Sequence, residues 1–262
     1  MSRFLILAYL FFLGALGGWV LELFFRRFIS NKNPERKWIN PGFLTGPYLP
    51  LYGFGLCILY LLASLDRFVP PDHLILGRAG LFLAMAVCMT LIEYIAGIGL
   101  LKLAHIRLWD YRDMPGNIQG VICPLFSAIW AAMGAAYYFL LYPVTLRALE
   151  WLANNLAFSF FIGVFFGVFF VDLGQTIHLA ANLKKFAEEN QVVVRYEELK
   201  EAIRRSNEEA KARAWFFFAF HTPRPLRETL DRYIERYRAL EPKLRERYQA
   251  IEPMIRRTIR RK

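Results

Sequence analysis

The chain has 262 residues, of which 56% are hydrophobic, and it carries 24 Phe, 6 Trp and a formal net charge of +11. So apolar a composition excludes a soluble domain of this size and predicts an integral membrane protein. The three cysteines lie inside apolar runs, which favours reduced packing residues over a disulfide framework.

Five apolar runs, taken in chain order, could cross a bilayer, since about 20 helical residues match a hydrocarbon core of about 30 Å. The first run lacks a small-residue cleavage site and is typical of a retained helix. Prolines and glycines crowd the first half of the second run, so we expect irregular backbone there and then a short helix. We predict an all-α, polytopic membrane helix bundle over residues 1–183, with spans at 4–25, 41–65, 80–104, 118–142 with a kink at Pro124, and 156–183.

Lysines and arginines near the span ends predict the orientation of these helices. One side has only Arg3, Arg67, Arg78 and Arg147. The other side of the membrane would hold the loop after the first run, the polar segment 108–117 and the start of the tail. Its basic residues are Arg26, Arg27, Lys32, Arg36, Lys37, Lys102, Arg107, Arg112, Lys184 and Lys185. We therefore predict an N-terminus outside, with segment 108–117 and the C-terminus in the cytoplasm.

Three carboxylates lie within the spans, namely Glu22, Glu93 and Asp172. Each costs about 2.5 to 3.5 kcal/mol at a helix centre, so each should be paired, hydrated or functional. Small residues share a helix face with Glu22 and with Glu93, which points both side chains into the bundle. We expect all three acids to line one polar pocket that faces the cytoplasm.

Structural roles remain open for each acid. Glu22 has Arg26 one turn later and could form a snorkelling ion pair, whereas Glu93 has no basic residue within a turn, which favours a functional or inter-helix role. Asp172 could anchor the bundle by hydrogen bonds. On the helix face opposite Asp172 lie Gly163, Gly167 and Gly174, for which a homodimer contact and packing within one bundle are both possible.

Several motifs together resemble the ABC-transporter type IV permease family of bacterial membrane proteins. These motifs are Gly18-Trp19-Val20-Leu21-Glu22, the proline and glycine block from Asn40 to Gly53, Glu93-Tyr94, and Trp109-Asp110-Tyr111 followed by Asn117, Gly120 and Cys123. The resemblance covers roughly residues 14 to 145. It implies a permease of the bacterial cytoplasmic (inner) membrane that is partnered by a separate ATPase.

The function that we predict is an ABC-type permease subunit, and the chain has no phosphate-binding loop to hydrolyse ATP itself. The candidate substrate-binding residues are Glu22, Asn40, Gly46, Pro47, Tyr48, Tyr52, Glu93, Trp109, Asp110, Tyr111, Asn117 and Asp172. We expect no cofactor and no metal, because the four histidines are scattered and no metal-ligand spacing occurs. Asp110 and Asp113 beside Arg107 and Arg112 favour one alternative, an enzyme acting on a lipid or isoprenoid phosphate; a membrane scaffold is the second.

The tail, residues 184–262, holds 21 basic and 13 acidic residues. It contains the aromatic run Trp215-Phe216-Phe217-Phe218 and an eleven-residue repeat, 235–245 and 246–256, which predicts an amphipathic helical tail that is kinked at Pro242 and Pro253. Interleaved acids and the aromatic anchor favour anionic lipid headgroups or a protein partner over nucleic acid.

Overall fold

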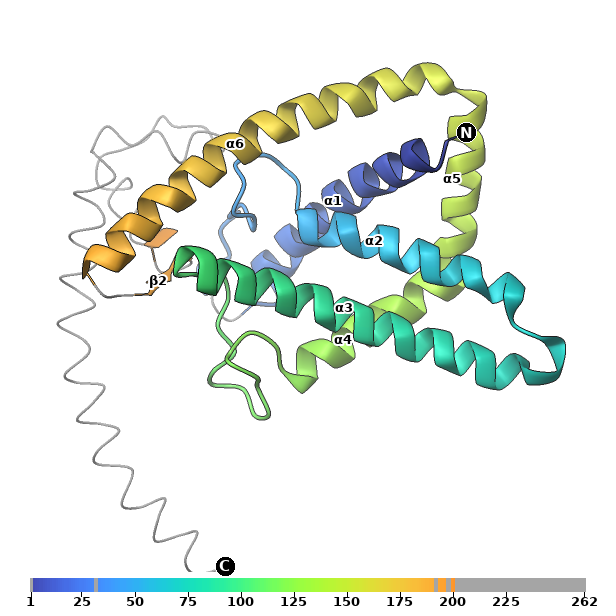
Figure 1. Ribbon diagram of the computed structural model, residues 1–262, viewed down its shortest axis with the longest axis horizontal. Helices are drawn as coiled ribbons and strands as arrows, with labels where there is room; N and C mark the ends of the chain where they lie inside the picture. The colour runs from blue at the N-terminus through green and yellow to red at the C-terminus, as the bar shows by residue number, and fades with distance from the viewer. Residues whose placement is uncertain (1, 31–32, 191–192, 197–198, 201–262) are drawn as a thin grey trace, which may run out of the picture. The chain divides into compact units, whose positions relative to one another are not determined.

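The computed structural model describes residues 2–30, 33–190, 193–196 and 199–200. Its elements are α1 (Arg3–Phe28), α2 (Pro50–Ala63), η1 (Ser64–Phe68), η2 (Pro71–His73), α3 (Leu74–Ala104), β1 (Ile106–Arg107), α4 (Pro124–Ala136), η3 (Tyr137–Leu141), α5 (Tyr142–Asn154), η4 (Leu156–Phe158), α6 (Ser159–Asn190) and β2 (Val194–Arg195). Five helical segments are long and apolar enough to cross a membrane, so the chain is a multi-pass membrane protein with an all-helical build (Figure 1). The predicted tail repeat and aromatic run lie outside the described residues, and the chain divides into units 1–195 and 196–262.

Helices α1 and α2 pack closely because glycines line the contact between them. A Cβ atom added at Gly14 would lie 2.7 Å from the carbonyl oxygen of Tyr52, and one added at Gly18 would meet the ring of Tyr52. Gly53 of α2 faces Phe11 of α1 in the same way. Small residues allow such close approach in membranes, where packing rather than water drives helix association.

Irregular backbone joins α1 to α2, as the prolines and glycines predict. Leu49 donates its backbone N–H to the carbonyl of Ala15 at 2.9 Å, which fixes the end of this segment against α1. Pro50 then begins α2 at a position where a missing N–H costs no helical hydrogen bond. The short helix and η1 together make the span Pro50–Phe68.

The predicted kink at Pro124 is wrong, because α4 begins there instead. Residues 118–123, expected to be helical, belong to the connector between α3 and α4 (residues 105–123). The change of direction comes later, at the π-helical turn η3 and Pro143. Figure 1 shows α5 running across the end of the bundle. Its buried residues Leu149 and Leu152 belong to one hydrophobic cluster with Tyr9 and Leu10 of α1.

The end of the first unit is tied to the α3–α4 connector by a parallel pair of two-residue strands. Ile106 pairs with Val194 and Arg107 pairs with Arg195.

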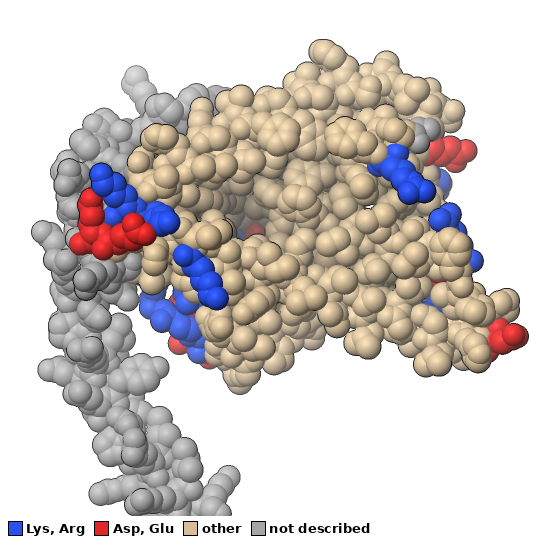
Figure 2. Space-filling view, in the orientation of Figure 1, with Lys and Arg blue, Asp and Glu red and all other residues tan. Residues whose placement is uncertain are grey.

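Figure 1 shows the C-terminal ends of α1, α3 and α6 on one side of this unit. Figure 2 shows charged side chains near the two ends and, between them, a broad band whose outer surface shows none on this face. That band matches the requirement that lipid-facing surface be apolar.

Candidate functional site

Glu93 lies in α3 with only 3% of its surface exposed. Its Oε1 accepts a hydrogen bond from the Tyr111 hydroxyl (3.1 Å), and its Oε2 accepts one from the Trp130 indole N–H (3.0 Å). Both donors are neutral, and no Lys or Arg forms an ion pair with Glu93 in the described part of the chain. Glu93 therefore joins α3 to the connector and to α4, which is the inter-helix role that the sequence left open.

Glu22 lies near the end of α1, and its side chain is 23% exposed. Its Oε1 accepts from Arg26 Nε at 3.0 Å, so the ion pair predicted from the spacing is present. Its Oε2 accepts from the Tyr52 hydroxyl of α2 at 3.2 Å. One oxygen is thus committed to a cation on its own helix and the other to a neutral donor on the next helix.

The two glutamates belong to one continuous set of contacts, because the rings of Tyr52 and Trp130 lie 5.4 Å apart between centroids. We call Glu22, Tyr52, Trp130, Glu93 and Tyr111 the carboxylate network. Burial, then the charge and hydrogen bond of Glu93 and the charge of Glu22, raise the pKa of Tyr111, so this hydroxyl stays protonated and can donate. Tyr111 is held in place by a stacked contact with Phe126 (centroids 4.4 Å apart).

Asp172 of α6, 8% exposed, binds a different set of groups. Its Oδ1 accepts from the backbone N–H of Thr45 (3.2 Å) and from the Thr176 hydroxyl (3.4 Å). Its Oδ2 accepts from the backbone N–H of Gly46 (2.9 Å) and from the Tyr48 hydroxyl (2.6 Å). We call this arrangement the Asp172 clamp, and it satisfies backbone N–H groups of the irregular segment that would otherwise be costly at membrane depth.

A second anchor of the same segment is Asn40. Its Oδ1 accepts from the indole N–H of Trp19 (2.9 Å) and from the backbone N–H of Gly42 (3.0 Å). Its Nδ2 donates to the carbonyl oxygens of Leu44 (3.3 Å) and Thr45 (3.0 Å). Asn40 and Asp172 therefore fix adjacent parts of the irregular segment, and both bind the backbone of Thr45.

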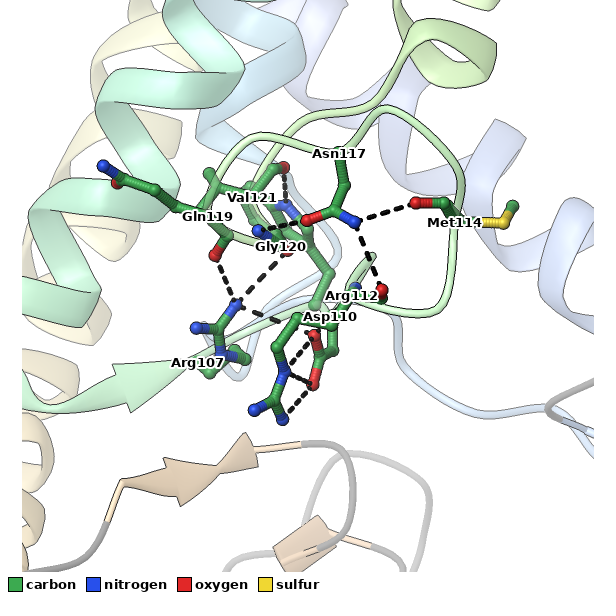
Figure 3. A network of polar contacts seen from close by, with 9 residues as sticks. Arg107, Asp110, Arg112, Met114, Asn117, Gln119, Gly120 and Val121 are labelled. Carbon is green, nitrogen blue, oxygen red and sulfur yellow. Dashed lines mark hydrogen bonds and ion pairs between the residues drawn. The ribbon is translucent and has the colours of Figure 1, made fainter. Parts of the chain in front are cut away.

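Polar groups of the α3–α4 connector mostly bind one another (Figure 3). Arg107 Nη1 donates to the carbonyl oxygens of Gln119 (3.1 Å) and Gly120 (3.3 Å). Arg112 Nη2 lies 2.7 Å from Asp110 Oδ2. Burial raises the pKa of the Asp110 carboxyl, but the hydrogen bonds and charge of Arg112, with the charge of Arg107, outweigh it and leave the pKa below its usual range.

Two further contacts close the connector on itself. Asn117 Nδ2 donates to the carbonyls of Arg112 (3.2 Å) and Met114 (2.8 Å), and Asn117 Oδ1 accepts from the Gly120 N–H (3.0 Å). Gly120 has φ +68°, a conformation that favours glycine. Trp109 donates its indole N–H to the carbonyl of Val121 (2.8 Å).

The predicted site residues thus fall into three groups rather than one pocket. Glu22, Glu93, Tyr52 and Tyr111 come together in the carboxylate network, and Trp109, Asp110 and Asn117 make contacts within the connector. The residues Asn40, Gly46, Tyr48 and Asp172, with Pro47 between them in the chain, form or flank the clamp. Sequence reasoning missed Trp130; the available signal was a buried indole N–H, which needs an acceptor.

Other expectations concern metals and helix packing. No group of three or more His, Cys, Asp or Glu side chains that could hold a metal ion occurs among the described residues. A Cβ atom added at Gly163, Gly167 or Gly174 would meet nothing within 4 Å in the same part of the chain. These glycines therefore make no tight packing contact inside the described bundle.

Comparison with known proteins gives one match. A family model described as "Putative ABC-transporter type IV" matches residues 9–177. No curated protein and no solved structure matched the chain. The matched range contains the whole carboxylate network and the Asp172 clamp.

Proposed function

We propose that this chain, which belongs to the ABC-transporter type IV family, is the permease subunit of a transporter that is driven by a separate ATPase. The observation that carries the proposal is the carboxylate network. It joins two acids from different helices, Glu22 and Glu93, through aromatic donors inside the bundle. Acids inside a membrane bundle typically mark substrate and ion pathways.

The network suits a transport path because its two acids differ. Glu22 is part-exposed and paired with Arg26, whereas Glu93 is buried and bound only by neutral donors. Figure 2 shows a hollow in the surface of the bundle with an acidic side chain in its depth. A path that begins at a solvated ion pair and continues to a buried carboxylate gives a substrate two successive polar positions.

The proposed orientation places the N-terminus outside and the α3–α4 connector in the cytoplasm of a bacterial cell, at the inner membrane. It is supported by the larger number of basic residues on the side where α1, α3 and α6 end (Figure 1). The network then opens toward the cytoplasm, because Glu22 lies near the end of α1 and Tyr111 lies in the connector.

The connector supports the transporter proposal better than the enzyme alternative. Asp110 is bound by Arg112 through three hydrogen bonds from side-chain nitrogen atoms, and Arg107 is bound to backbone carbonyls. These groups stiffen a loop rather than present a phosphate site. We therefore expect the purified chain alone to turn over neither phospholipid nor polyprenyl phosphate.

Purification from native membranes in mild detergent tests the proposal. We expect an ATPase with a phosphate-binding loop to co-purify, and its ATP hydrolysis in the assembly to fall at least about tenfold in Glu93→Gln, the effect of roughly 1.4 kcal/mol. Glu150→Gln, which changes the same charge on an exposed face of α5, is the matched control. Absence of an ATPase, or equal hydrolysis in the two variants, would contradict the proposal.

A further inference from the structure

The end of α1 carries a cluster of two arginines and three aromatic residues that the carboxylate network does not use. Asn33 builds the turn that folds the chain back at this point. Its Nδ2 donates to the carbonyls of Arg26 (3.2 Å) and Lys37 (2.7 Å), and its Oδ1 accepts from the Lys37 N–H (3.2 Å). With 6% of its surface exposed, Asn33 is a buried structural residue. The turn brings Arg36 and Trp38 back to the last turn of α1.

Arg36 reaches this position at a cost in backbone strain. Its φ is +52°, a left-handed conformation that is unfavourable for a residue other than glycine. Its Nη1 donates to the backbone carbonyl of Arg27 at 3.1 Å. This bond places the Arg36 guanidinium at the backbone of Arg27, where α1 ends.

Arg27 is held between rings. Its guanidinium carbon lies 4.2 Å from the ring centroid of Trp38 and 5.5 Å from that of Phe28. Its Nε is buried and has no hydrogen-bond partner among the described residues. Neither Arg27 nor Arg36 forms an ion pair with a carboxylate in that part of the chain, whereas the adjacent cations Arg26 and Lys37 do.

Exposed apolar side chains lie beside Arg27. Phe24, Phe28 and Trp38 are 49%, 56% and 45% exposed and contact one another edge to face or stacked. Aromatic residues of this kind gather where the hydrocarbon core of a bilayer meets its headgroups. A ligand at this place would meet positive charge on one side and an apolar wall on the other.

We propose that Arg27 and Arg36, with Phe24, Phe28 and Trp38, form a binding site for the headgroup of an anionic phospholipid. Arginine matches phosphate by charge and by its planar fork of donors, and no carboxylate among the described residues occupies these N–H groups. The exposed rings give the first carbons of the acyl chains an apolar surface. Both requirements of a lipid are met side by side, whereas a free phosphate would use only the first.

Thermal unfolding of the full chain in detergent micelles tests the site. Phosphatidylglycerol should stabilise the wild type more than phosphatidylcholine does at equal concentration. Each guanidinium removed should weaken phosphatidylglycerol binding about fivefold, the effect of roughly 1 kcal/mol per basic residue near a membrane surface. Arg27→Gln and Arg36→Gln should therefore each lower the excess stabilisation, and the double variant should lower it most.

Arg147→Gln is the matched control, because it removes an exposed arginine from α5 and should keep the full excess. Arg27→Lys keeps the charge but loses the fork of donors. Phosphatidylglycerol should therefore stabilise it more than phosphatidylcholine does, but by less than in the wild type, and this comparison holds even if Arg27→Gln folds poorly. Native mass spectrometry should find one retained phosphatidylglycerol fewer in the double variant than in the wild type. The proposal would be overturned if phosphatidylglycerol stabilised the wild type no more than phosphatidylcholine or inorganic phosphate does. It would also be overturned if phosphatidylglycerol stabilised the double variant as much as the wild type.

Discussion

Asp172→Asn should destabilise the bundle although it changes only one atom. Asp172 accepts four hydrogen bonds, two at each oxygen, and an asparagine has one accepting oxygen. The shorter bonds, from Gly46 (2.9 Å) and Tyr48 (2.6 Å), would keep that oxygen, so the amide nitrogen would face the donors of Thr45 and Thr176.

The size of the effect follows from these bonds. Hydrogen bonds between side chains in membrane proteins average about 0.6 kcal/mol with a maximum near 1.7, and bonds to charged groups in water-soluble proteins reach about 1.5 to 3. Two lost bonds, with the loss of charge at the two that remain, give a destabilisation of about 2 to 3 kcal/mol. The carboxylate is only 8% exposed, so solvent screening reduces this little.

Unfolding in mixed micelles measures the loss, and Tyr48→Phe is the control because it removes one bond and no charge. We expect Tyr48→Phe to cost about 1 kcal/mol and the double variant to cost clearly less than the sum of the single variants. Hydrogen exchange should also show faster exchange of the Thr45 and Gly46 amides in Asp172→Asn. A loss below 0.5 kcal/mol (roughly the value for a surface substitution), with unchanged exchange, would refute the clamp as a structural element.

Two further changes test other parts of the fold. Gly18→Ala should displace the Tyr52 ring and destabilise the α1–α2 contact by about 1 to 3 kcal/mol, whereas Gly17→Ala, where a Cβ atom meets nothing within 4 Å, should be neutral or slightly stabilising in the same unfolding assay. The lowered pKa of Asp110 means that its contribution to stability is complete above its unfolded pKa of about 3.9 and is lost as pH falls through the folded value. Hydrogen exchange of the connector should therefore rise on acidification below about pH 4 in the wild type and show no such step in Asp110→Asn, with Asp113→Asn behaving like the wild type.

Helix positions were predictable because lipid imposes one rule on every span. Any long apolar run must become a helix that satisfies its own backbone, so the run at 80–104 falls within the observed α3 and the run at 156–183 within η4 and α6. Proline was harder to interpret. Pro124 and Pro143 both lie in or beside the fourth run, and a proline can begin a helix as well as bend one.

The carboxylate network was predictable only in part. Small residues at helical spacing correctly predicted that the side chains of Glu22 and Glu93 point into the bundle, and the spacing of Glu22 and Arg26 predicted their ion pair. The partner of Glu93 could not be found in this way, because Trp130 is 37 residues away on another helix. Periodicity tells which face of a helix is buried and is silent about the helix that faces it.

The sequence by itself determined that this chain crosses a membrane several times, that its irregular backbone lies before α2, and that its acids avoid lipid. Each of these follows from local composition and from the cost of polar groups in hydrocarbon. The tertiary structure decided that Glu22 and Glu93 share a network while Asp172 holds the irregular segment to α6. That choice depends on hydrogen bonds between residues 30 to 127 positions apart, and such pairings are set by how the helices pack rather than by any single stretch of chain.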